Sequence, residues 1–179
     1  MGRATRHALA ILLLPGTVAV LVPLLIARFA GTELGLPESW PGWSAWGTGL
    51  LVLGFGVGLF TASLRRLGGE GRGTLAPWDP PERLVVRGPY AHVRNPLISG
   101  VVLVLLGEGL LLRSVAHLGW AGLFFLANAA YIPRVEEPAL GAKFGEAYEE
   151  YARNVPRLIP RIRPWRRGNA DADPGGPPP

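Results

Sequence analysis

The sequence predicts an all-α protein: a polytopic membrane helix bundle of about four transmembrane helices with a cytoplasmic C-terminal helical region. Three observations predict this class. Apolar residues make up 49% of the 179 residues and charged residues 17%, whereas soluble domains are about 25% charged. The apolar residues form four long blocks, and a membrane-crossing helix needs about 20 such residues. Finally, the Lys and Arg residues collect at one side of these blocks.

The four blocks cover residues 8–27, 44–64, 97–112 and 115–133. The first follows two arginines, so a signal peptide is the alternative to a retained helix. Only Arg113 and Ser114 separate the third block from the fourth, which predicts an antiparallel hairpin. In the second block Gly54 and Gly58 have the small-xxx-small spacing that lets helices approach closely. The alternative is a glycine-rich helix that packs without a special face.

Charge predicts the orientation of the bundle. Of the 18 Lys and Arg residues, only Arg28 and Arg113 lie at block ends assigned to the outside, and the other 16 lie in the N-terminus, the loop 65–94 and the C-terminal region. Cytoplasmic loops carry the positive excess. We therefore expect a multi-pass protein of the plasma (inner) membrane with both termini cytoplasmic. Since the arginines follow the membrane, we expect contacts with membrane lipids and no nucleic acid partner.

The parts outside the blocks predict one domain, residues 1–167, followed by a disordered tail of Pro, Gly and Asp at 168–179. Residues 139–154 predict a helix that Pro156 ends. Its apolar stripe consists of Leu140, Phe144, Tyr148 and Tyr151. This helix is expected on the membrane surface or against the bundle.

Two cytoplasmic stretches, 82–100 and 134–151, carry the residues best suited to chemistry. Asn95 and Pro96 suit the N-cap and first turn of the third block. The arginines around them indicate either a ligand site or a loop that binds anionic lipid headgroups. Glu136 and Glu137 follow the fourth block, where carboxylates either complement a helix N-terminus or hold the ammonium group of a ligand.

Glu108 lies between two glycines in the third block. A carboxyl group in a membrane helix is costly and is a functional candidate by default. The alternative is that it lies near the outer end and pairs with Arg113. His117 and Asn128 are predicted to make interhelical hydrogen bonds. There is no cysteine, no metal-ligand spacing and no nucleophile elbow, so we predict no metal site and do not expect a hydrolase.

Several short pieces along residues 82–161, each weak alone, occur in an order and spacing that resembles a known superfamily. They are Leu84-Val85, Gly88-Pro89-Tyr90, Val93-Arg94-Asn95-Pro96, Gly100, Gly107-Glu108-Gly109, Glu136-Glu137, and Phe144-Gly145-Glu146-Ala147-Tyr148 with Tyr151. The pattern resembles the isoprenylcysteine carboxyl methyltransferase and phospholipid methyltransferase superfamily of integral membrane enzymes.

The resemblance implies that segments 82–96 and 134–161 fold over S-adenosylmethionine at the cytoplasmic face. It also implies a lipid-like or prenyl-like substrate, with a carboxylate or amine as methyl acceptor, that enters from the bilayer. No metal is implied. The implied cofactor-binding residues are Leu84, Val85, Gly88, Pro89, Tyr90, Asn95, Pro96, Leu97, Glu136 and Glu137. The catalytic candidates are Arg94, Arg134 and Glu108.

The chain departs from the family pattern at two places. Where Asn95 stands the family often has histidine, and where Leu97 and Ile98 stand it often has tyrosine. Asn95 can form hydrogen bonds but cannot act as a titrating base. Two other functions stay open: a membrane NADPH-dependent reductase of the sterol-reductase type, and a non-catalytic membrane scaffold. Binding of S-adenosylmethionine or of NADPH separates the three.

Overall fold

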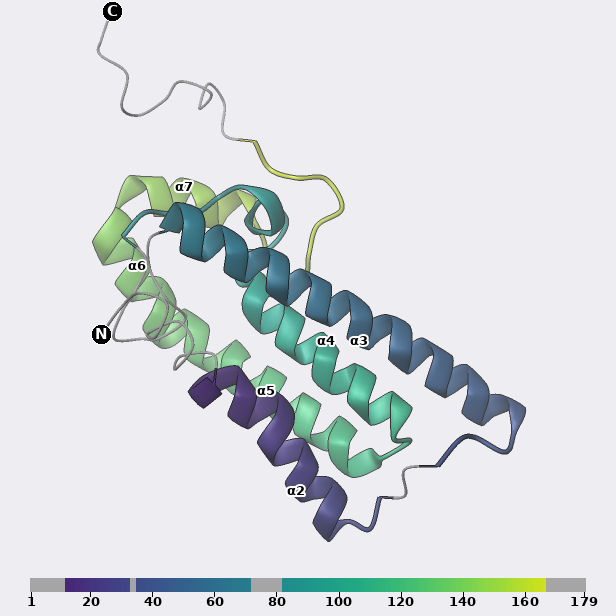
Figure 1. Ribbon diagram of the computed structural model, residues 1–179. Coiled ribbons are helices and arrows are strands. Elements are labelled where there is room, and N and C mark those ends of the chain that lie inside the picture. The colour runs from purple at the N-terminus through teal and green to yellow at the C-terminus, as the bar shows by residue number, and fades with distance from the viewer. Residues whose placement is uncertain (1–11, 33–34, 72–81, 167–179) are drawn as a thin grey trace, which may run out of the picture.

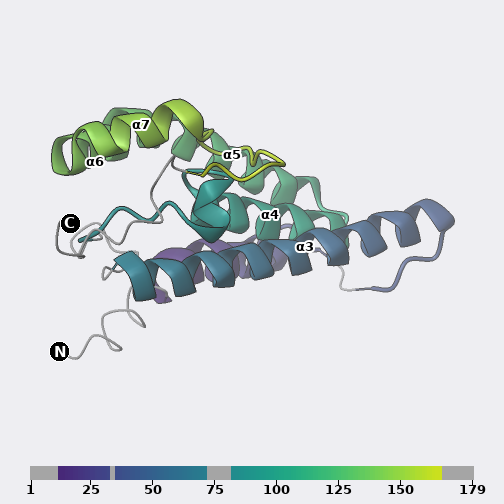
Figure 2. The ribbon, with the colours of Figure 1, turned by 90° about the horizontal axis from the view of Figure 1, so that it is seen from above.

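The computed structural model describes residues 12–32, 35–71 and 82–166, and this part of the chain is helical without a β-strand. Its helices run side by side, with α6 and α7 at the end where α3 ends and α4 begins (Figures 1 and 2). The elements are η1 (Leu12–Leu21), α2 (Val22–Phe29), α3 (Trp40–Arg66), η2 (Leu67–Gly71), η3 (Gly88–Ala91), α4 (Pro96–Leu111), α5 (Val115–Tyr131), η4 (Ile132–Glu136), α6 (Glu137–Phe144) and α7 (Glu146–Asn154). Here η3 is a 3-10 turn, and η1, η2 and η4 are π-helical stretches.

Two continuous helices in the described residues are long and apolar enough to cross a membrane. They run from Trp40 to Gly71 and from Val115 to Phe144. Two further apolar helices, Pro15–Phe29 and Pro96–Leu111, are shorter. Large apolar side chains on the long helices face outward; Leu51 is 77% exposed and Val115 83%. Such exposure is costly in water and normal in lipid. The predicted all-helical class is confirmed for the described residues, with two helices of the length and composition of membrane spans where the sequence predicted about four.

Helices α3 and α4 pack backbone against backbone through glycines spaced seven residues apart. A Cβ atom on Gly49 would lie 2.7 Å from the backbone nitrogen of Leu111, and one on Gly56 would lie 2.8 Å from that of Val104. From the other side, Gly107 leaves 2.6 Å between such an atom and the backbone nitrogen of Leu53. Seven residues are two helical turns, so the glycines form one stripe along the contact.

The predicted contact face at Gly54 and Gly58 is wrong. A Cβ atom on either residue would meet nothing within 4 Å. Gly56 lies midway between them in sequence and therefore points to the opposite side of the helix. The glycines of α3 that contact α4 are therefore spaced seven residues apart, whereas the pair spaced four residues apart faces away from α4.

The first apolar block packs on α5. The indole nitrogen of Trp120 donates to the carbonyl of Val18 at 3.0 Å, and Nε2 of His117 donates to that of Pro23 at 3.1 Å. The hydroxyl of Ser114 accepts from the backbone nitrogen of His117 and caps α5. The interhelical role predicted for His117 is confirmed. That predicted for Asn128 is wrong, because its amide donates to Phe124 within α5 at 2.9 Å.

The predicted hairpin is confirmed. Helices α4 and α5 are joined by Leu112, Arg113 and Ser114, and Arg113 has φ 49°, which reverses the chain direction. Its guanidinium donates to the carbonyl of Gly35 at 3.1 Å and makes no ion pair with Glu108 among the described residues. The predicted alternative pairing of these two residues is therefore wrong.

The helix predicted over residues 139–154 is two helices. Gly145 separates α6 from α7 with φ 55° and ψ −136°, a conformation that side chains strongly disfavour. The helix ends at Asn154, before Pro156, as predicted. Tyr148 and Tyr151 of its stripe are buried with Val155. Residues of the loop before α4, of α6 and α7 and of the C-terminal segment pack against this cluster, namely Leu84, Val86, Leu140, Phe144, Ala152 and Trp165.

The glycine contact predicts how single alanine substitutions affect stability. Gly107→Ala places a methyl group against the α3 backbone and should lower the free energy of unfolding by about 1–3 kcal/mol. Gly58→Ala is the matched control: it faces open space and exchanges glycine for a better helix former, worth up to about 1 kcal/mol. Thermal unfolding in detergent measures both. Equal losses would contradict the assigned face.

Candidate functional site

A cavity of about 640 Å³ lies at the end of the bundle covered by α6 and α7, and it is within the size range of small-molecule sites. Residues of three apolar clusters line it: one around Leu67 and Val85, one around Val101, and one around Tyr148 and Tyr151. Its residues come from η1, α3, η2, the segment 83–97, α4, α5, η4, α6 and α7. The two stretches that the sequence singled out, far apart in the chain, therefore share one cavity.

The walls of the cavity differ in polarity from one side to the other. Val18, Phe60, Val101 and Phe124 belong to the apolar cluster between η1 and helices α3, α4 and α5. Most of the polar lining residues come from the segment before α4, from the η4–α6 junction and from α7, namely Arg83, Tyr90, Arg94, Asn95, Glu136, Glu137, Tyr148 and Tyr151. Helix α5 adds Asn128 and Tyr131. A molecule with one apolar and one charged part matches this division.

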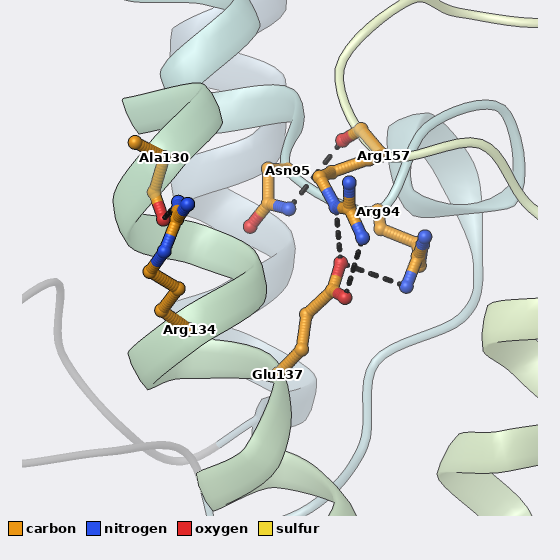
Figure 3. Close-up of polar contacts among 6 residues, drawn as sticks. All are labelled: Arg94, Asn95, Ala130, Arg134, Glu137 and Arg157. Carbon is orange, nitrogen blue, oxygen red and sulfur yellow. Dashed lines mark hydrogen bonds and ion pairs between the residues drawn. The ribbon is translucent and has the colours of Figure 1, made fainter. Parts of the chain in front are cut away.

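Glu137 is held by two arginines (Figure 3). Arg157 donates to both of its carboxylate oxygens, from Nε at 2.6 Å and from Nη2 at 2.8 Å, and Arg94 approaches with Nη1 at 2.9 Å. The bidentate geometry is the strong form of this pair, and it raises the pKa of Arg157 above its usual value. Asn95 adds a hydrogen bond to the Arg157 carbonyl at 3.4 Å. This cluster joins α6, the beginning of α4 and the C-terminal segment.

Glu136, beside it, has no such partners. It lines the same cavity and makes no hydrogen bond or ion pair within the described ranges. It is partly buried, and a carboxylate withdrawn from water gains by pairing with a cation. Both glutamates line the cavity, but Glu137 is paired with two arginines and Glu136 has no partner within the described residues.

Two further polar atoms at the cavity are buried without a hydrogen-bond partner among the described residues: the hydroxyl of Tyr90 and Nε of Arg94. Burial, and secondarily the charge of Glu136, raises the pKa of Tyr90, so its hydroxyl stays protonated and can donate. Buried polar groups are normally satisfied. Unpartnered groups at a cavity wall are therefore candidate ligand contacts.

The loop before α4 is held in place by the C-terminal segment. The hydroxyl of Tyr151 donates to the carbonyl of Tyr90 at 2.7 Å, and the backbone nitrogen of Arg94 donates to that of Pro156 at 2.8 Å. Asn95 occupies the N-cap position, but its side chain makes no cap bond, contrary to the prediction, and Pro96 opens α4. The cavity wall is therefore built by tertiary contacts.

Most, but not all, of the residues that the resemblance implied lie at the cavity. Those that line the cavity are Leu84, Val85, Tyr90, Arg94, Asn95, Pro96, Leu97, Glu136 and Glu137. Four others do not line it. Gly88, with φ 61°, and Pro89 form the turn that begins η3. Arg134 is exposed and donates to the Ala130 carbonyl of its own helix at 2.9 Å (Figure 3).

Glu108 lies 12 positions after the start of α4, about 18 Å along the helix. Its Oε2 atom is buried without a partner in the described part of the chain. The structure therefore does not bring Glu108 or Arg134 together with the other candidates.

Sequence reasoning missed the partner of Glu137 and part of the aromatic wall. Arg157 lies 20 positions after Glu137, and no periodicity links the two. The tyrosine stripe did signal that Tyr148 and Tyr151 turn inward, but not that they line a cavity. Asn128 also lines it.

Comparison with known proteins assigns the family. The profile described as Phospholipid methyltransferase matches residues 45–147, more than half of the chain. The chain belongs to the phospholipid methyltransferase family. The match covers helices α3 to α6, including most of the residues around the cavity.

Two curated relatives share part of this family region. Over 81 residues the chain is 41% identical to methanethiol S-methyltransferase 2 of Bradyrhizobium diazoefficiens, covering 44% of this chain and 29% of that protein. Over 83 residues it is 35% identical to the cobalt-zinc-cadmium resistance protein CzcN of Cupriavidus metallidurans, covering 46% and 38%. The chain thus matches well under half the length of either relative. Within its described residues, no group of His, Cys, Asp and Glu could hold a metal ion.

The cluster around Glu137 predicts an order of stabilities. Glu137→Gln leaves two arginines without their anion and should lower the free energy of unfolding by about 1–3 kcal/mol, because removing one partner of a partly buried pair strands the other. Arg157→Gln leaves Glu137 paired with Arg94 and should cost less. Thermal unfolding in detergent measures both, with exposed Glu149→Gln as control. The reverse order would contradict the assigned roles.

Proposed function

We propose that this chain is an S-adenosylmethionine-dependent methyltransferase that binds its cofactor in the cavity beneath α6 and α7. The observation that supports it most is the unpaired Glu136 carboxylate. It faces the same cavity as the unpartnered hydroxyl of Tyr90 and Nε of Arg94. The family assignment supports the same reaction class.

The charges of the cavity suit this cofactor. S-adenosylmethionine supplies an activated methyl group on a sulfonium, and it also carries an ammonium and a carboxylate. Glu136 is the residue we assign to the ammonium, because Glu137 already faces Arg94 and Arg157. Nε of Arg94 and the hydroxyl of Tyr90 are donors for the carboxylate or other polar groups.

The apolar wall suits a lipid-like acceptor that reaches the cavity from the bilayer. Val18, Phe60 and Phe124 lie on elements that we propose to span the membrane, and they line the cavity. Methyl transfer is a displacement that depends mainly on alignment of the reacting atoms. A rigid apolar wall that holds the acceptor supplies alignment and excludes water. A carboxylate acceptor needs no general base, and we assign none.

We further propose that all four apolar helices span the membrane, with the cavity at the cytoplasmic face of a plasma (inner) membrane. The positive excess near that end supports this orientation. Contact with membrane lipids follows from it.

A second candidate acceptor is a small thiol. It is favoured by one observation, the 41% identity over 81 residues to a protein named methanethiol S-methyltransferase 2. A thiol carries no long apolar tail, so the two candidates differ in what the apolar wall would hold.

Cofactor binding to the detergent-purified full chain tests the proposal. S-adenosylmethionine should bind, and Glu136→Gln should weaken binding by about tenfold or more, which corresponds to roughly 1.4 kcal/mol. Exposed Glu146→Gln is the matched control and should bind normally. Calorimetry or equilibrium dialysis supplies the measurement. Binding of NADPH alone would indicate the reductase, and binding of neither cofactor the scaffold.

The acceptor is identified by transfer of label. Protein in membranes is incubated with methyl-labelled S-adenosylmethionine in two separate reactions. One contains total membrane lipid and the other contains small thiols. We expect label in a lipid fraction. Phe124→Ala should reduce this label, because it removes part of the apolar wall and leaves extra space in the cavity. Label in the thiol alone would replace the lipid-like acceptor by the second candidate.

A further inference from the structure

The C-terminal segment from Pro156 to Arg166, which we call the strap, follows α7 as an extended chain without helix. Figure 1 shows it in yellow, running past the beginning of α4. It lies outside the region that matches the family, which ends at residue 147. Arg157 supports the cavity through Glu137, but neither the family match nor the proposed methyl transfer gives a role to the side chains of the strap that point outward.

Hydrogen bonds fix the strap to the fold along its length. The backbone nitrogens of Arg161 and Trp165 donate to the carbonyls of His92 and Ala91 at 2.9 and 2.8 Å. The hydroxyl of Ser99 in α4 donates to the Leu158 carbonyl at 2.7 Å. Because the backbone is held at both ends and in the middle, the side chains that point outward are presented in a set direction.

The side chains of the strap that point outward are of two kinds, isoleucines and arginines. Ile162 is 95% exposed and Ile159 74%. Between and after them stand arginines: Arg161 donates to the Asn154 carbonyl at 2.7 Å, while the exposed side chains of Arg163 and Arg166 make no hydrogen bond or ion pair within the described residues. The strap carries four arginines and no acidic residue. If both isoleucines faced water, the favourable free energy of burying these two side chains would be lost.

The strap also adjoins the apolar flank of the bundle. Leu158, Ile159 and Pro160 enclose a small apolar cavity of about 170 Å³ together with Val102 and Leu103 of α4 and Phe125 of α5. Ile159 therefore lies beside apolar side chains of α4 and α5, and Arg161, Arg163 and Arg166 follow it in the sequence.

We propose that the strap is an interfacial membrane anchor. Ile159 and Ile162 insert among the acyl chains of the leaflet at the cavity end, and Arg163 and Arg166 bind the phosphate groups of anionic phospholipids. The division into an apolar and a basic side is that of peptides that lie in the membrane interface. Charge complementarity selects anionic lipid, since each arginine near such a surface is attracted to it.

The absence of cysteine from the sequence allows a direct test on the full chain. Ile162→Cys or Ile159→Cys is labelled with a nitroxide and reconstituted into phosphatidylcholine vesicles. Collisions with oxygen, which concentrates in hydrocarbon, are compared with collisions with a water-soluble nickel chelate. We expect oxygen to be favoured severalfold at both positions. Glu149→Cys, on exposed α7 surface, is the matched control and should favour the nickel chelate.

The arginine contacts are tested by lipid composition. Adding phosphatidylglycerol to the vesicles should further lower nickel access at position 162, and Arg163→Gln with Arg166→Gln should remove this lipid dependence. The anchor is refuted if the label at 162 meets nickel as freely as the label at 149. It is equally refuted if that label is shielded from both reagents, because the isoleucines would then face protein. No response to phosphatidylglycerol would overturn the selection of anionic lipid.

Discussion

The ion pairs of Glu137 with Arg94 and Arg157 hold the charged end of this molecule together. They join three parts of the chain that no local preference would bring together: the end of the long α5–α6 helix, the loop before α4 and the segment after α7. Two of these parts, the end of the α5–α6 helix and the loop before α4, line the cavity. The same contacts neutralise Glu137 and leave Glu136 as the cavity carboxylate without a partner among the described residues, so the electrostatic character of the site depends on them.

The apolar helices are held together by different contacts. Lipid tails are as apolar as leucine, so helices in a bilayer associate through close packing and polar contacts. Here the glycine stripe of α3 and α4 supplies the close packing. Trp120 and His117 supply hydrogen bonds that tie the N-terminal segment to α5. These contacts place Val18, Phe60, Val101 and Phe124 around the inner wall of the cavity.

The family region and the strap divide the protein into a shared part and an individual part. Residues 45–147 hold most of the cavity wall and match the phospholipid methyltransferase family. The strap lies beyond them, yet Arg157 within it completes the cluster around Glu137. The proposed contact of the strap with lipid and the pairing of Glu137 therefore depend on one short segment that hydrogen bonds hold in place.

The sequence alone determined the helical class, the hairpin at Arg113 and the two stretches that form the site, because runs of apolar residues, charge and turn chemistry are local properties. Tertiary structure decided the rest. Which glycines of α3 make contact depends on the rotation of one helix against another, so the prediction at Gly54 and Gly58 was wrong. Which glutamate stays unpaired depends on Arg157, which reaches Glu137 only after the chain has turned back through α6 and α7. Such long-range pairing leaves no periodic trace in sequence, because its geometry exists only in the folded chain.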